Sequence, residues 1–184
     1  MLQDAVFNLQ SVLPLPLQLD SSNTQALEKA MRMYNGKAMI NSVNGKQSSM
    51  NEVFPLVQKY GGVVACLCLD ENGIPETAKG RIAIAEKIIK TAESYGIDKK
   101  DLVVDALVMT ISTNKDNAKE TLKAVEYIRH ELGVGTVLGV SNISFGLPKR
   151  EAINTAFFTL ALKAGLSAGI INPLSESTVS YTHL

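Results

Sequence analysis

Four side chains that could hold a polar ligand follow short apolar runs along this 184-residue chain. They are Asp20 in LPLQLDSS, Asn41 in KAMINSVNG, Asp105 in DLVVDALVMT and Asn142 in GTVLGVSNIS. An ionised carboxylate only accepts hydrogen bonds, whereas an amide both donates and accepts, so the set offers both functions. The pattern indicates a ligand site built from the ends of strands.

Structural roles compete with ligand binding at two of these positions, Asp20 and Asn41. Asp20, with the Ser-Ser-Asn that follows it, could equally cap the N-terminus of a helix. Asn41 could form a turn together with Asn44 and Gly45. Asp105 is harder to assign to a structural role, because it interrupts the apolar run LVVDALVM and a carboxylate there needs a partner or a purpose.

Strands and helices are predicted to alternate along the chain. Apolar runs rich in Val, Ile and Leu predict six strands, within residues 15–22, 37–45, 62–73, 101–110, 135–144 and 166–173. Apolar residues at three-to-four spacing predict five helices between or after them, over residues 23–35, 48–61, 78–96, 117–133 and 149–165. Most of these helices close on a glycine. This alternation predicts a parallel sheet covered by helices.

The polar strand ends favour a barrel over an open sheet. A (β/α)8 TIM barrel gathers all its carboxyl strand ends at one mouth, whereas an open doubly wound sheet uses mainly those beside its switch point. All six predicted strands end in polar residues. Because a full barrel has eight strands and about 250 residues, we expect an incomplete α/β barrel of about strands 3 to 8 with their helices, as a piece of a larger protein.

Both ends of the chain depart from the repeating pattern. Residues 4–14 are typical of the end of a helix whose own strand is absent, and the final STVSYTHL has no helical periodicity. We therefore expect one partial barrel over residues 1–174 and a tail over residues 175–184 that is non-native or disordered. The open flanks of the first and last strands predict self-association or poor solubility, which a monodisperse, cooperatively melting monomer would contradict.

The composition argues against several classes of protein. The 18 basic and 18 acidic residues cancel without forming a basic patch, which argues against a nucleic-acid partner. No apolar run is long enough to span a membrane and the N-terminus has no basic signal region, so we expect a cytoplasmic protein. Cys66 and Cys68 lie two apart in an apolar run, which favours reduced core thiols. His130 and His183 have no spacing that would indicate a metal site.

Five segments together resemble one enzyme family. They are LPLQLDSS, MINSVNGK, VVDALVMTIST, GTVLGVSNISFGLPKRE and AGIINP. They are similar to the pterin-binding barrel of the methyltetrahydrofolate:corrinoid methyltransferases, the group that includes cobalamin-dependent methionine synthase. The segment SNISFGLP after an apolar strand is the most specific of the five, and the resemblance runs from about residue 15 to residue 173.

The resemblance implies a barrel that binds 5-methyltetrahydrofolate at its mouth. It implies that the N5-methyl group is presented to a Co(I) cobalamin or other corrinoid on a separate domain, as in the conversion of homocysteine to methionine. Any zinc would belong to a homocysteine domain outside this chain. The fragment alone is expected to be inactive, since two strands of the pocket and the corrinoid domain are absent. The residues that the resemblance assigns to pterin binding are Asp20, Asn41, Asp105, Gly139, Ser141 and Asn142.

Asp105 and Asn142 are the predicted catalytic residues. A pterin ring presents its 2-amino group and a ring N–H, for which an ionised carboxylate such as Asp20 or Asp105 is a two-point acceptor. Release of the methyl group from N5 is helped by a hydrogen bond that strengthens as charge develops, which the amide of Asn142 can supply. Asn142 lies too far upstream of the helix that follows Pro148 to cap it, which favours a functional role.

Other functions fit parts of the pattern. Phe145 stands where some methyltransferases of the corrinoid iron-sulfur branch have a polar residue, which favours the methionine synthase branch. Dihydropteroate synthase shares the pterin barrel, but it carries a lysine on the seventh strand and a basic residue on the eighth, where this chain has VSNIS and IINP. A third alternative is a truncated module that binds pterin without turnover. Lys149 and Arg150, at a helix start near the mouth, could meet the polyglutamate tail of folate or the corrinoid domain, but solvated charge is the favoured interpretation.

Overall fold

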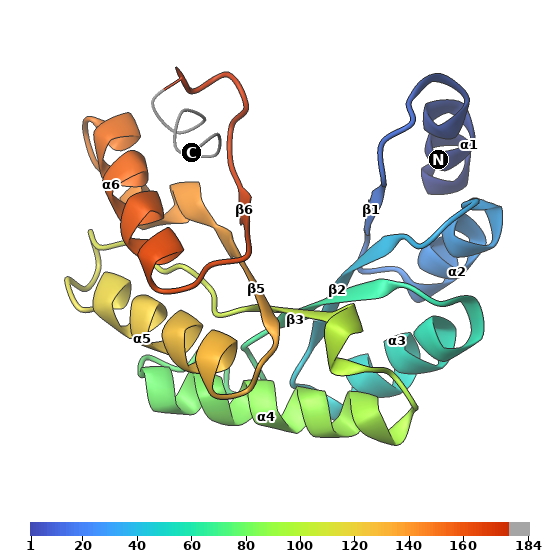
Figure 1. The fold of residues 1–184 in the computed structure, drawn as a ribbon, viewed down its shortest axis with the longest axis horizontal. Coiled ribbons are helices and arrows are strands. Elements are labelled where there is room, and N and C mark those ends of the chain that lie inside the picture. Colours follow the sequence, from blue (N-terminus) through green and yellow to red (C-terminus); the bar gives the residue numbers. More distant parts are fainter. Residues whose placement is uncertain (177–184) are drawn as a thin grey trace.

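A curled parallel sheet with helices along its outer side forms the fold (Figure 1). The computed structural model describes residues 1–176. Its strands are β1 (Gln18–Asp20), β2 (Met39–Asn44), β3 (Val63–Leu67), β4 (Leu102–Asp105), β5 (Gly135–Gly139) and β6 (Ala168–Ile170). All pairs are parallel and the strand order is sequential from β1 to β6. Sequential order without a switch point is the topology of a barrel, so the predicted incomplete barrel is confirmed.

All five predicted helices form, and the N-terminal segment predicted as the end of a helix forms a sixth, α1. They are α1 (Leu2–Val12), α2 (Thr24–Met33), α3 (Gln47–Tyr60), α4 (Ala78–Ser94), α5 (Asn117–His130) and α6 (Arg150–Lys163). Where the chain leaves α3 and α4, Gly61 and Gly96 have φ of 73° and 75°, a conformation that glycine adopts without steric cost. Two short 3₁₀ turns, η1 (Lys99–Asp101) and η2 (Val140–Ser144), were not predicted from the sequence.

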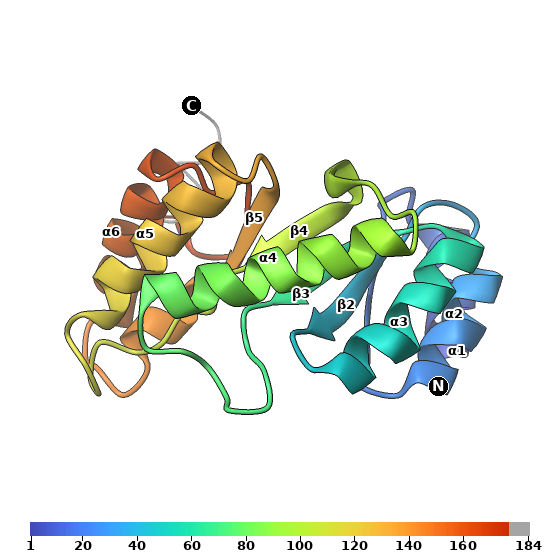
Figure 2. The ribbon, with the colours of Figure 1, turned by 90° about the horizontal axis from the view of Figure 1, so that it is seen from below.

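The helices pack against the convex side of the sheet, and α4 runs across its middle (Figure 2). Strands β1 and β6 stand on either side of the open part of the half-barrel (Figure 1). None of the helices within residues 1–176 is long and apolar enough to cross a membrane. The predicted tail over residues 175–184 falls mainly on residues 177–184, which lie outside the described residues. Self-association through the sheet edges stays a prediction.

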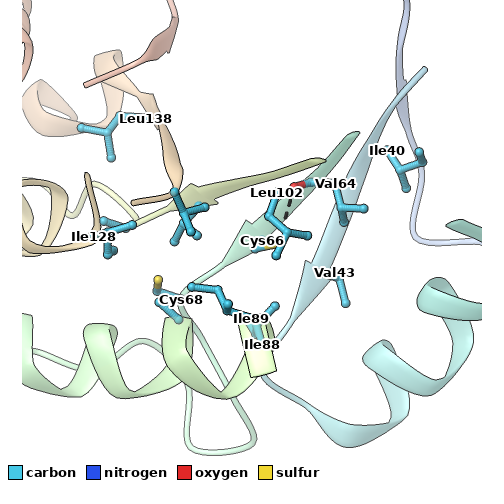
Figure 3. Packing of buried hydrophobic residues seen from close by; sticks show 14 of the residues in the cluster. Ile40, Val43, Val64, Cys66, Cys68, Ile88, Ile89, Leu102, Ile128 and Leu138 are labelled. Carbon is cyan, nitrogen blue, oxygen red and sulfur yellow. Dashed lines mark hydrogen bonds between the residues drawn. The ribbon is translucent and has the colours of Figure 1, made fainter. Parts of the chain in front are cut away.

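The core lies between the sheet and the helices, as Figure 3 shows. Alternate strand residues such as Ile40, Val64 and Leu102 are fully buried there and belong to one cluster with Ile88 of α4 and Ile128 of α5. Full burial of such a side chain contributes about 1.5–3 kcal/mol. This layer fixes which strand residues face the helices, and therefore which residues face the hollow of the sheet.

The two cysteines belong to the same buried layer. Cys66 and Cys68 are free thiols with no exposed surface. Burial raises the pKa of the Cys66 thiol to about 12, so it stays protonated at neutral pH. The prediction of reduced core thiols is confirmed.

Candidate functional site

The strand residues predicted to bind a ligand share the concave face of the sheet. Asp20 pairs with Asn41, and Asp105 pairs with Leu67 on one side and Val137 on the other. These positions alternate with the buried ones that face the helices, and Gly139 lies two residues beyond Val137 on the same face. The alternation therefore directs Asp20, Asn41, Asp105 and Gly139 toward the hollow of the half-barrel.

Asp20 and Asn41 form one wall of the site. Asn41 Nδ2 donates a hydrogen bond to Asp20 Oδ2 at 3.3 Å, and Asp20 is exposed. The alternative capping role of Asp20 is not observed, because Asn23 is the N-cap of α2 and its Oδ1 accepts from Ala26 N at 2.9 Å. A cavity of about 350 Å³ opens at this wall, lined among others by Asp20, Ser21, Asn41, Ser42, Asn44 and Lys46.

A register shift in β2 determines the roles of its two asparagines, Asn41 and Asn44. The register with β3 shifts between Asn41 and Val43, so Val43 pairs with Cys66 and is fully buried. An inserted residue of this kind turns the following side chains to the opposite face of a strand, and Asn44 thereby reaches the same side as Asn41. Asn44 Oδ1 accepts from Lys46 N at 3.0 Å, so Asn44 shapes the turn and Asn41 is the better candidate for ligand contact.

Asp105 lies at the end of the central strand β4, between the two halves of the sheet. Its Oδ1 accepts from Leu107 N at 2.8 Å. Burial raises the pKa of Asp105 to about 6, although the Leu107 amide and the Arg81 guanidinium act in the opposite direction. A carboxyl group with such a pKa can accept hydrogen bonds as an anion and can also hold a proton near neutral pH.

The turn η2 carries the remaining predicted residues. Ser141 and Asn142 are exposed, and the Asn142 amide makes no hydrogen bond within residues 1–176. A Cβ atom at Gly139 would lie 3.1 Å from Asn142 Nδ2, so the glycine leaves room for that amide. Of these two residues Asn142 is therefore the better candidate for ligand contact, and Gly139 permits its position.

Arg150 is exposed, as the sequence suggested, but it also makes hydrogen bonds that the sequence did not predict. Its Nη2 donates to Ser141 O at 2.9 Å and its Nε donates to Ser144 Oγ at 3.0 Å. The buried Ser144 hydroxyl donates in turn to Asn154 Oδ1 at 2.7 Å. These bonds fix the turn that presents Asn142, and Lys149, like Arg150, is exposed. A second cavity of about 520 Å³ lies beside them, lined among others by Val140, Ser141, Arg150, Asn154, Ile170 and Asn172.

Sequence reasoning also missed Arg81, which lies behind Asp105. Arg81 of α4 is fully buried, and the carbonyl oxygens of Ala106 and Leu107 accept from its Nη1 at 3.3 and 2.9 Å. A signal was present in the sequence, because Arg81 occupies the same helical stripe as the apolar Ile84 and Ile88. A charge on an apolar stripe indicates a buried partner.

Comparison with protein families identifies the chain's relatives. Residues 2–172 match the family described as pterin binding enzyme. The chain is 34% identical over 171 residues to methionine synthase from Mycobacterium tuberculosis, covering 86% of this chain and 14% of that protein. It is 27% identical over 174 residues to methylcorrinoid:tetrahydrofolate methyltransferase from Eubacterium limosum, covering 91% of this chain and 63% of that protein. The chain thus spans only part of the length of these relatives.

Solved structures with the same fold include dihydropteroate synthase from Xanthomonas albilineans. The structure with 4-aminobenzoic acid superposes with a TM-score of 0.79 at 21% identity, covering 98% of this chain and 70% of that one. The structure with 7,8-dihydropteroate gives a TM-score of 0.70 at 20% identity, covering 97% of this chain and 68% of that one. At such identities the similarity establishes the barrel fold alone.

Proposed function

We propose a specific function on the premise that this chain belongs to the pterin-binding enzyme family. The proposed function is to bind 5-methyltetrahydrofolate and present its N5-methyl group to a corrinoid on a separate domain, in the methionine synthase reaction. The observation that carries the proposal is that Asp20, Asn41 and Asp105 share one concave face. The identity to methionine synthase, together with SNISFGLP, supports methyl transfer as the reaction.

Pterin recognition is assigned to the two carboxylates and Asn41. The 2-amino group and the adjacent ring N–H of the pterin are donors, and ionised Asp20 and Asp105 are acceptors suited to them. Asn41 already donates to Asp20, which orients that carboxylate and leaves the amide oxygen of Asn41 for a further donor. The partly buried position of Asp105 strengthens its hydrogen bonds, because water competes less there.

Stabilisation and protonation of the pterin N5 atom, as the methyl group leaves, are assigned to Asn142 and Asp105. A corrinoid supplies the Co(I) nucleophile that accepts the methyl group. The amide of Asn142 has no partner within residues 1–176 and can form a hydrogen bond at N5 that strengthens as charge develops. Because the pKa of Asp105 is raised to about 6, the ionised form that accepts from the pterin is in equilibrium with a protonated form near neutral pH, and that form can deliver its proton through water or through Asn142.

Methyl transfer should be tested in the parent protein. We expect Asn142→Ala to slow demethylation of 5-methyltetrahydrofolate by Co(I) cobalamin by about 100-fold with a much smaller change in affinity for the folate. Asn8→Ala, which changes an exposed amide on α1, is the matched control and should have no effect. An unchanged rate in Asn142→Ala would contradict the assignment.

Direct binding to the 184-residue chain separates the alternatives. Calorimetric titration with 5-methyltetrahydrofolate should show saturable binding that Asp105→Ala weakens. Binding without methyl transfer in the isolated chain would fit a pterin-binding module without turnover. Turnover with p-aminobenzoate and a pterin pyrophosphate, and none with methyltetrahydrofolate, would instead identify a dihydropteroate synthase. Transfer to a corrinoid iron-sulfur protein, in preference to free cobalamin, would favour that branch of the family.

A further inference from the structure

Arg81 is the largest side chain of the described residues that is fully buried. It comes from α4 and lies between the segment that follows β4 and helix α5. A guanidinium stays charged in proteins, and burial of a charge is unfavourable unless its donors are used. Its position in the core therefore requires an explanation beyond packing.

The bonds of Arg81 are directed at the segment that follows Asp105. Nη1 donates to Leu107 O at 2.9 Å, to Ala106 O at 3.3 Å and to Thr121 Oγ1 at 2.7 Å. Nε donates to Pro75 O at 2.9 Å, and Nη2 is buried without a hydrogen-bond partner. Within residues 1–176 no carboxylate lies within ion-pair distance of Arg81. The side chain thus holds neutral acceptors on two successive residues of one turn.

That turn contains a strained residue next to the site. Leu107 has φ of 61°, a left-handed conformation that a branched side chain rarely adopts. Such a conformation persists only where the surroundings fix it, and here Leu107 O accepts from both Arg81 and Thr121 Oγ1. The N–H of the same residue donates to Asp105 Oδ1 at 2.8 Å. Leu107 therefore connects the two side chains, because its carbonyl oxygen accepts from Arg81 and its N–H donates to the Asp105 carboxylate.

The charged groups around Asp105 also connect this carboxylate with Arg81. Arg81 faces it from α4, and its charge opposes the rise in the pKa of Asp105 that burial causes. Cys68 directly follows β3, and its backbone N–H donates to Asp105 O at 3.0 Å. Burial, followed by the charge of Asp105, raises the pKa of its thiol. Glu120 of α5 acts on Arg81, and β5, with the sequence GTVLG, has no titratable side chain. Arg81 is thus the cation that faces this carboxylate.

We infer that Arg81 is the positioning residue that orients the Asp105 carboxylate toward the pterin through the Ala106–Leu107 turn. The identity of the ligand in this inference rests on the proposed function. The effect of Arg81 on Asp105 does not depend on it. Arg81 acts from the helix side of the sheet and touches Asp105 only through the turn. It is therefore not a catalytic residue.

The test compares two substitutions of Arg81 in the full chain. Arg81→Gln removes the charge, and carbon-13 NMR should show the Asp105 carboxyl titrating about one pH unit higher than in the unsubstituted chain. Arg81→Lys keeps a charge but loses the planar fork, so the midpoint should shift less. For 5-methyltetrahydrofolate, affinity at pH 7 should fall roughly 10-fold in Arg81→Lys and further in Arg81→Gln. If Arg81→Gln does not fold, Arg81→Lys alone carries the test.

A rescue and a control separate positioning from general stability. Leu107→Gly removes the steric cost of the left-handed turn, so adding it to Arg81→Lys should recover part of the lost affinity. Ile88→Ala, at another fully buried position of α4, should lower the melting temperature and leave the Asp105 midpoint and the affinity unchanged. A folded Arg81 variant with unchanged midpoint and affinity would overturn the inference. If no variant binds the folate and the unsubstituted chain does not either, the proposed function fails, while the NMR midpoint still decides the role of Arg81.

Discussion

Asp20 and Asp105 are the same amino acid at equivalent ends of two strands, yet the fold places them in different surroundings. Asp20 is exposed on edge strand β1 and receives one hydrogen bond, from Asn41 at 3.3 Å. Asp105 lies on central strand β4, partly buried, with the Leu107 amide at 2.8 Å and Arg81 behind it. The comparison shows that the place of a strand in the sheet sets the properties of the carboxylate at its end.

The largest expected difference between these regions is in their local stability. Amide hydrogens of β4, which is paired on both sides, should exchange roughly 1,000-fold more slowly than those of β1, which is paired only with β2. The reason is that opening β4 disrupts the central core, whereas β1 can separate alone. Hydrogen exchange followed by NMR or mass spectrometry measures this difference. Equal protection of the two strands would remove the basis of the comparison.

The next effect is on ligand affinity. We expect Asp105→Ala to weaken binding of 5-methyltetrahydrofolate about 100-fold and Asp20→Ala about 10-fold, because hydrogen bonds to a charged group are worth roughly 1.5–3 kcal/mol and are strongest away from water. Calorimetric titration at pH 7 gives both values. Asp4→Ala, on the outer helix α1, is the control. The reverse order for the two site variants would assign the main pterin contact to Asp20.

A smaller effect concerns the dependence of stability on pH. The pKa of Asp105 is raised to about 6, above the value of about 4 in an unfolded chain. The folded state therefore holds this proton more tightly, and the contribution of Asp105 to the free energy of unfolding falls as the pH rises from about 4 to 6. Relative to Asp105→Asn, the unsubstituted chain should lose on the order of 2 kcal/mol between pH 4 and pH 7. Urea denaturation at several pH values measures it, and a constant difference would contradict the raised pKa.

The smallest expected effect is on the free energy of unfolding, at the exposed wall formed by Asp20 and Asn41. Asn41→Ala removes the hydrogen bond to Asp20, but both groups can then bond to water, so the free energy of unfolding should fall by only about 0.5 kcal/mol. Thermal melting without folate measures this change. A loss of several kcal/mol would show that Asn41 holds β1 in place, and that its main role is structural.

The helices and strands could be predicted from the sequence because they depend on local patterns of apolar residues. Apolar runs rich in Val, Ile and Leu located all six strands, and three-to-four spacing of apolar residues located the helices. The polar residues at strand ends indicated the concave face. The use of Asn23 as the cap of α2, which releases Asp20 from that role, was not predictable, because Asp, Ser and Asn are all good capping residues.

The sequence by itself determined the parallel strand-helix alternation, the barrel topology and the positions at which polar groups meet the hollow of the sheet. Only the tertiary structure decided how the surroundings of these polar groups differ. The register shift between β2 and β3, the hydrogen bond from Arg150 to η2 and the hydrogen bonds from Arg81 to the turn after Asp105 all join residues far apart in the chain. The physical reason is that hydrogen bonding and desolvation depend on distances in space. Apolar periodicity fixes the face to which a side chain points, but not the partners that it finds there.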